Sequence, residues 1–140
     1  MSVQALTGWL TALALAAAFS TYLLKQIGRE YVKRLPREYA DFADAYRSFM
    51  KLMVGRHRIF GAAALIALAA HAYPVIAGSF ISVSGLIAAF VLICASAAGA
   101  WLFYGKKSLR TGLLSVHRAL AFVLLPALII HFFFTGMIAF

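Results

Sequence analysis

Four long apolar blocks constrain this chain more than any other feature. They span about 3–24, 59–78, 80–104 and 113–139, and each approaches or exceeds the roughly 20 residues that an α-helix needs to cross a bilayer. Hydrophobic residues make up 64% of the 140, and only four side chains are acidic, which is too little polar material to cover a soluble domain. We therefore predict an all-α protein, a single membrane domain over 1–140 with four transmembrane helices in an up-and-down bundle.

The net charge of +9 follows the connections between these blocks. Nine of the thirteen Lys and Arg residues lie between Lys25 and Arg58, and the others are Lys106, Lys107, Arg110 and Arg118. The connection around 73–82 has none, so the positive-inside rule places the first and third connections in the cytoplasm and both termini outside. A bacterial inner or plasma membrane fits this pattern, and loops that flank a membrane explain the charge better than a nucleic-acid site.

The first block carries no ligand candidates, and the connection after it is polar. Positive charges follow the first block instead of preceding it, so we expect a retained packing helix and not a cleaved leader. In the connection, aromatic and methionine side chains recur every three or four residues between charged ones over about 37–53. This pattern predicts an amphipathic helix on the cytoplasmic membrane surface. It would serve as an anchor, as a docking surface for an electron donor, or as one wall of a quinone site.

The four histidines form two pairs with the same spacing. His57 and His71 lie 14 residues apart at the ends of the second block, and His117 and His131 repeat that interval in the fourth. Fourteen helical residues return to within roughly 40° of the starting direction and rise about 21 Å. Each helix is therefore expected to present two imidazoles on one face, at two depths in the membrane.

Chain direction decides which histidines can meet. The second and fourth blocks run the same way in an up-and-down bundle, so His57 matches His117 in depth and His71 matches His131. Two imidazoles per level are the number that a haem iron needs in addition to its four ring nitrogens. Zinc or copper also accept imidazole, but two histidines without an acidic or thiol partner leave a zinc shell incomplete. The lone Cys94 and the absence of a Cys-x-x-Cys-His sequence favour two non-covalently held haem b groups.

Residues around the histidines are candidates for contacts with the haem. Arg56, Arg58 and Arg118 flank the inner pair, where propionates would accept charge-assisted hydrogen bonds, although the positive-inside bias explains these arginines almost as well. Near the outer pair, the polar candidates are Tyr73, Ser79, Ser82 and Ser84.

Two glycines and one proline mark the third and fourth blocks. Gly85 and Gly99 are again 14 apart, level with His71 and His57, and would admit a flat ring or simply allow close helix packing. Pro126 cannot donate to the carbonyl oxygen of Phe122, so we expect a kink in the fourth block.

These motifs resemble those of membrane cytochrome b proteins of the ferric-reductase-like and small di-haem type. The likeness covers about 55–139 and depends on Gly55-Arg56-His57-Arg58-Ile59-Phe60-Gly61 with His71, and on His117-Arg118 with His131. The resemblance implies that the four histidines are axial ligands in a helical bundle that conducts electrons across the membrane. This chain has four apolar blocks and not six, and lacks a flavin or nicotinamide domain, so the source of electrons stays open.

The function expected from these features is electron transfer. Bis-histidine ligation fills both axial positions, so the iron would exchange electrons without binding a substrate. The chain would carry electrons between a quinone pool or cytoplasmic donor and an extracytoplasmic acceptor, as a subunit of a larger redox complex or as a quinone-coupled oxidoreductase. The alternative is a non-redox transporter or assembly subunit whose histidines bind a metal or protons.

Overall fold

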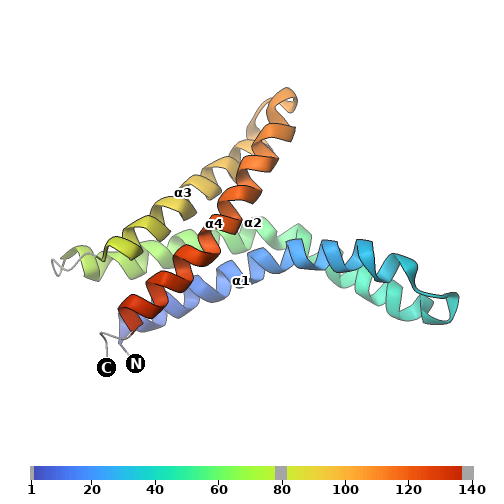
Figure 1. The fold of residues 1–140 in the computed structure, drawn as a ribbon, viewed down its shortest axis with the longest axis horizontal. Coiled ribbons are helices and arrows are strands. Elements are labelled where there is room, and N and C mark those ends of the chain that lie inside the picture. The colour runs from blue at the N-terminus through green and yellow to red at the C-terminus, as the bar shows by residue number, and fades with distance from the viewer. Residues whose placement is uncertain (1, 78–81, 137–140) are drawn as a thin grey trace. The chain divides into compact units, whose positions relative to one another are not determined.

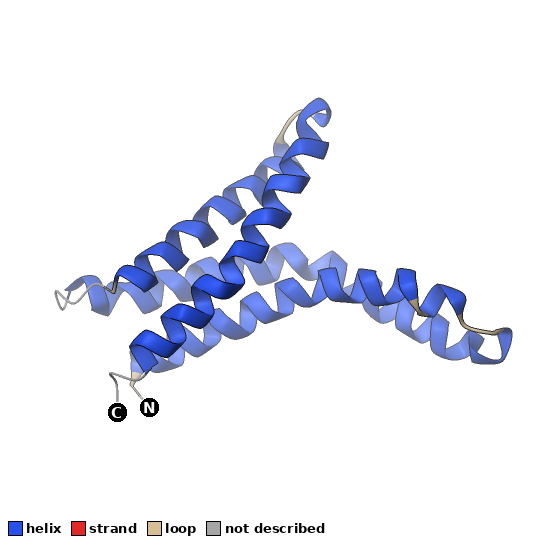
Figure 2. Ribbon diagram, viewed as in Figure 1, coloured by secondary structure: helices blue, strands red, loops and turns tan. Residues whose placement is uncertain are grey.

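The computed structural model describes residues 2–77 and 82–136, and this part of the chain consists of helices and short turns (Figure 2). Four helices are long and apolar enough to cross a membrane, which confirms the predicted all-α class and the predicted number of such helices. They are α1 (Val3–Glu30), α2 (Ala40–Ala77), α3 (Val83–Tyr104) and α4 (Arg110–Gly136). Three short 3-10 turns join them: η1 (Val32–Arg34), η2 (Arg37–Tyr39) and η3 (Lys107–Leu109).

The chain divides into two compact units, Met1–His71 and Ala72–Phe140. Each unit is built around an antiparallel pair of helices, α1 with α2 in the first and α3 with α4 in the second (Figure 1). Each unit is described below by itself.

In the first unit, one tyrosine joins the polar ends of α1 and α2. The hydroxyl of Tyr46 on α2 donates a hydrogen bond to the carbonyl oxygen of Leu24 on α1, at 2.7 Å. Gly28 of α1 lies against the ring of Tyr46 and the sulfur of Met50, so the two backbones approach closely where α1 has no side chain. The polar segment after the first apolar block is therefore a continuation of the helix pair.

The helix boundaries correct the predicted organisation of this segment. We expected a separate surface helix over about 37–53 followed by a span from 59, whereas α2 is one helix of 38 residues, about 57 Å long at 1.5 Å per residue. No proline interrupts the segment between 40 and 73, and a helix tolerates Gly55 at a modest cost. The helix also continues through Pro74 for one more turn, and α1 extends six residues beyond the predicted end at 24.

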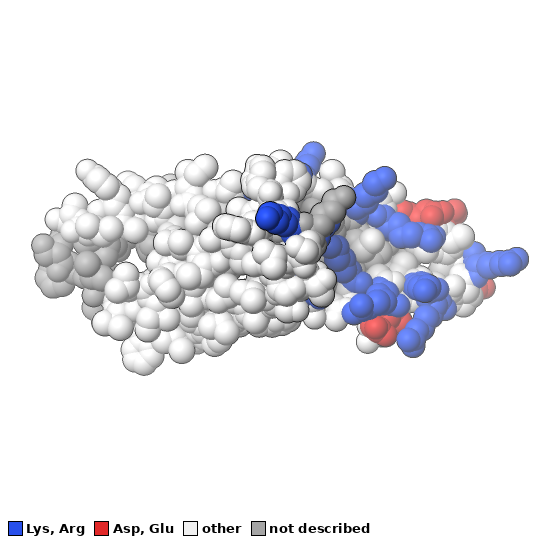
Figure 3. Space-filling view, turned by 90° about the horizontal axis from the view of Figure 1, so that it is seen from above, with Lys and Arg blue, Asp and Glu red and all other residues white. Residues whose placement is uncertain are grey.

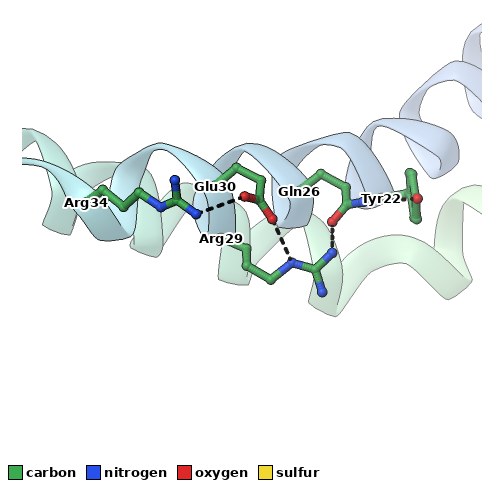
Figure 4. A network of polar contacts seen from close by, with 5 residues as sticks. All are labelled: Tyr22, Gln26, Arg29, Glu30 and Arg34. Atoms are coloured by element: carbon green, nitrogen blue, oxygen red, sulfur yellow. Dashed lines mark hydrogen bonds and ion pairs between the residues drawn. The ribbon is translucent and has the colours of Figure 1, made fainter.

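Charged side chains cover the part of this helix pair that extends beyond the apolar blocks (Figure 3). A polar network runs along α1 and its C-terminal turn (Figure 4): the guanidinium group of Arg29 contacts Gln26 and Glu30, and Arg34 lies 3.3 Å from Glu30. The side chains of Arg29, Glu30 and Arg34 are more than half exposed, so each ion pair contributes little to folding.

In the second unit, α3 and α4 pack through small and medium-sized side chains. The buried residues of α3 are Ala88, Val91, Leu92, Ala95 and Ala98. Large apolar side chains such as Phe90, Ile93 and Trp101 are more than half exposed, which is typical of a helix surrounded by lipid. The helix α4 continues through Pro126. The predicted end of the second span at 78, the start of the third at 80–81 and the end of the fourth at 137–139 lie outside the described residues.

The histidine-bearing helices of the two units repeat each other. Segments 61–70 and 121–130 show the same order of buried, half-buried and exposed positions, with Ala64 and Leu124 as the buried residue of each. His-Arg precedes each segment, at 57–58 and 117–118, and Leu-x-Ala-Leu-x-x-His runs from the second half of each segment to the histidine that follows it, His71 or His131. The sequence repeat is therefore also a structural one.

Candidate site: four histidines held by facing helices

In the first unit, both histidines of α2 point at the backbone of α1. The Nδ1 atom of His57 lies 3.1 Å from the carbonyl oxygen of Ala18 and 3.2 Å from the hydroxyl oxygen of Thr21. Near the other end of the apolar segment, the Nδ1 atom of His71 lies 3.0 Å from the carbonyl oxygen of Gln4. The helix α1 is therefore more than a packing element, because it supplies the acceptors for both imidazoles.

The second unit repeats this arrangement on α3 and α4. The Nδ1 atom of His117 lies 2.8 Å from the carbonyl oxygen of Ala95. The Nδ1 atom of His131 lies 3.4 Å from the hydroxyl oxygen of Ser84, which itself contacts the hydroxyl of Ser82 at 2.8 Å. Three of the four histidines thus have a carbonyl partner, and His131 has a longer contact with a hydroxyl group.

The carbonyl partners determine which ring nitrogen carries the proton. A carbonyl oxygen can only accept a hydrogen bond, so Nδ1 of His57, His71 and His117 must be the protonated nitrogen. In a neutral imidazole the other nitrogen, Nε2, then holds a lone pair and is the one able to bind a metal ion. This is the arrangement found in metalloproteins, where a second partner fixes the tautomer and orientation of a ligating histidine.

Glycines make room for three of the imidazoles. A Cβ atom added to Gly8 would lie 3.1 Å from the Cε1 atom of His71. In the second unit, a Cβ atom at Gly85 would lie 2.9 Å from Cε1 of His131, and a Cβ atom at Gly99 would lie 3.1 Å from Cε1 of His117. Any side chain at these positions would push the ring away from the facing helix.

Two of these glycines also expose the carbonyl oxygen that the histidine uses. On a helix, a side chain lies close to the carbonyl oxygen four residues earlier, which is why Ser and Thr can hydrogen-bond there. Gly8 follows Gln4 by four residues and Gly99 follows Ala95 by four, so each leaves its carbonyl open to a second donor. At the fourth histidine, His57, a hydroxyl group takes part instead: buried Thr21 donates to the Ala18 oxygen at 2.8 Å.

These contacts change the interpretation of Gly85 and Gly99. The sequence suggested that they admit a flat ring or allow helix packing, and the structure shows that they lie against His131 and His117 of their own unit. Sequence reasoning missed Gly8, Ala18 and Thr21 altogether. A comparison of the first and third blocks could have found two of them, because Gly8 precedes Ala18 by ten residues, as Gly85 precedes Ala95.

The other predicted residues occupy more open positions. Arg56, Arg58 and Arg118 are exposed beside the inner histidines, and Tyr73 is exposed two residues after His71. Cys94 is half-buried on α3. The expected couples, His57 with His117 and His71 with His131, each join the two units and remain predictions. Among the described residues, no group of three His, Cys, Asp or Glu side chains comes together as a metal ion would require.

The donor set of each unit fits a bis-histidine haem protein. Each unit offers two imidazoles 14 residues apart on one helix, each with an Nδ1 contact to the neighbouring helix. Imidazole nitrogens of this kind are the axial ligands that an iron porphyrin takes. Comparison with family models, with curated proteins and with solved structures found no match to this chain.

Proposed function

We propose that this protein is a small di-haem membrane cytochrome b that carries electrons between the two faces of a membrane. The observation that supports this best is the same contact at all four histidines: the Nδ1 atom of each lies within hydrogen-bond distance of an oxygen atom on the facing helix. A carbonyl partner at Nδ1 leaves the lone pair on Nε2, which is the arrangement that a metal-binding imidazole requires.

In this proposal, His57 and His117 hold one haem b and His71 and His131 hold the other. When bound, each haem supplies a one-electron couple between ferric and ferrous iron. The carbonyl oxygens of Ala18, Gln4 and Ala95 and the hydroxyl of Ser84 keep the imidazoles oriented, so that no ligand has to rotate when the charge at the iron changes.

Other residues of the site would bind the porphyrin edge and exclude water. Arg56, Arg58 and Arg118 flank the inner histidines at the charged end of the apolar segments and would hold propionates. Ser82 and Tyr73 are the described polar candidates near the outer histidines, with Ser79 outside the described residues. Gly85 and Gly99 serve the site indirectly, because they let His131 and His117 lie against α3.

The proposed orientation follows from charge, and the proposed partners follow from the electron-transfer role. Both termini lie outside, and the connections rich in Lys and Arg face the cytoplasm of a bacterial inner or plasma membrane. Electrons pass between a quinone pool or cytoplasmic donor and an extracytoplasmic acceptor, with other redox subunits as partners. With two histidines holding it, each haem would supply electron transfer and not substrate binding.

Purification of the full chain tests this proposal. The protein should be red, with a reducible b-type absorption spectrum and two haem b groups per chain by the pyridine haemochrome assay. Expression of the variant with all four histidines changed to Ala controls for haem that associates non-specifically with apolar helices. A colourless preparation that contains stoichiometric zinc or copper would contradict the proposal and favour the transporter or assembly-subunit alternative.

A further inference from the structure

The polar end of the first unit contains a hollow that the electron-transfer function does not use. It lies between the C-terminal part of α1, η1 and the first half of α2, with a volume of about 340 Å³. Its lining residues are Lys25, Gly28, Arg29, Val32, Lys33, Tyr46, Arg47 and Met50. Four of these eight residues are cationic and none is acidic.

The floor of the hollow is apolar and fixed in position. Gly28 contributes no side chain, Val32 is 8% exposed, and the sulfur of Met50 lies against Gly28. Tyr46 is held by its hydrogen bond to the carbonyl oxygen of Leu24. A ligand in this hollow would therefore meet an apolar surface in its centre and positive charge at its edge.

The cations at the edge differ in how far they are already neutralised. Arg47 lies 2.9 Å from Asp44, and Arg29 lies 3.6 Å from Glu30. Within 2–77 and 82–136, Lys25 and Lys33 make no ion pair with an acidic side chain. These two lysines therefore offer the largest uncompensated positive charge to an incoming anion.

The place of the hollow along α1 favours a membrane lipid over a soluble anion. Lys25 is the first residue after the apolar segment of α1, so the hollow opens at the level where the hydrocarbon core ends. Headgroup phosphates lie at this level, and the apolar floor suits the glycerol and upper acyl chain of the same molecule. Cations next to a cytoplasmic membrane face attract anionic lipids in this way.

We propose that this hollow binds the headgroup of an anionic phospholipid, with Lys25 and Lys33 as the main contacts for the phosphate. The site goes beyond the proposed electron-transfer function and does not depend on haem. Lys25 and Lys33 are exposed, so their replacement should leave the fold and any haem content unchanged.

Binding of short-chain phosphatidylglycerol to the detergent-purified full chain tests the proposal, with phosphatidylcholine and inorganic phosphate as the other probes. Native mass spectrometry counts the bound lipid, and thermophoresis measures the affinity. The chain should bind one phosphatidylglycerol more tightly than phosphatidylcholine. Each lysine should contribute roughly a fivefold gain in affinity. The double variant Lys25→Gln, Lys33→Gln should therefore weaken the binding of phosphatidylglycerol by about 25-fold.

The matched control is the double variant Lys51→Gln, Lys106→Gln, which removes two exposed lysines outside the hollow. It loses the same net charge and should change the affinity less than threefold. Equal weakening in both double variants would overturn the proposal, because the attraction would then be a general charge effect. Binding of inorganic phosphate as tight as that of phosphatidylglycerol would also overturn it, by showing a site for soluble anions.

Discussion

The Nδ1 atom of His117 lies 2.8 Å from the carbonyl oxygen of Ala95, and the same imidazole ring covers Gly99 one turn further along α3. The carbonyl oxygen already accepts the helical N–H of residue 99 and uses its second lone pair for the histidine. The contact costs α3 none of its own hydrogen bonds, and it fixes both the position and the tautomer of the ring.

Gly99→Ala should disturb one haem and leave the other intact. The added methyl group would lie 3.1 Å from Cε1 of His117, so the ring must shift and its bond to Ala95 must lengthen. We expect a lower melting temperature and partial loss of one of the two haems, measured by differential scanning fluorimetry and the haemochrome assay. Gly112→Ala is the matched control, because no atom lies within 4 Å of a Cβ at that position. Equal haem loss in both variants would show that Gly99 has no special role.

The predicted couples can be tested by comparing single histidine variants. His71→Ala and His131→Ala should remove the same haem and give matching difference spectra, because each deletes one axial ligand of one iron. His57→Ala and His117→Ala should remove the other haem. Low-temperature absorption and electron paramagnetic resonance spectra distinguish the two haems. If His71→Ala matched His117→Ala instead, the assignment of the couples would be wrong.

Ser84→Ala should raise the reduction potential of one haem. A hydrogen bond from Nδ1–H makes a ligating imidazole more basic and stabilises ferric iron, so its loss favours the ferrous form. Potentiometric titration should show the shift only in the haem that His71→Ala removes. Thr21→Val is a useful comparison, because His57 keeps the carbonyl oxygen of Ala18 and its haem should shift less. An unchanged potential in Ser84→Ala would mean that the 3.4 Å contact does not affect the ligand.

The haem-free protein should already hold the protonated Nδ1 tautomer at three histidines. His57, His71 and His117 face carbonyl oxygens, which cannot donate a proton. Nitrogen-15 chemical shifts of the histidine rings in the apoprotein report the tautomer directly. Signals from the Nε2-protonated form at these three residues would contradict the orientation of the rings. His131 is the internal comparison, because the hydroxyl of Ser84 can either donate or accept.

Cysteine labelling in intact cells tests the proposed orientation. In a Cys94→Ser background, single cysteines at the exposed positions Ser48 and Ser108 should react only after the membrane is permeabilised. A cysteine at the exposed position Ser2 should react with an impermeant maleimide from outside. The reverse pattern would place the basic connections outside and invert the assignment of inner and outer histidines.

The sequence was sufficient to predict the four helices, because apolar length alone determines them, and to predict that the histidines lie on two helices. It was not sufficient for the segment 37–53, where an amphipathic period fits a surface helix and the first half of a longer helix equally well. The contact of Tyr46 and Met50 with Gly28 packs the first half of α2 against α1, and this tertiary interaction has no signal in the local sequence pattern.

The partners of the histidines were hidden for a similar reason. Backbone carbonyl oxygens carry no sequence signature, so Gln4, Ala18 and Ala95 could not be identified from residue type. Only the glycines that expose such oxygens are visible in the sequence. Gly8 lies in the first block, which contains no histidine and is therefore expected only to pack. The match between the spacing of Gly8 and Ala18 and that of Gly85 and Ala95 is the signal that was present.

The unbroken course of α2 has a mechanical consequence. Tyr46 and His57 belong to one rigid rod and are separated by about 16 Å of helix, three turns without a hinge. Tilting the N-terminal end of this rod must therefore tilt the imidazole as well. A partner that displaces the charged first half of α2 would therefore change the angle of the imidazole ring of His57.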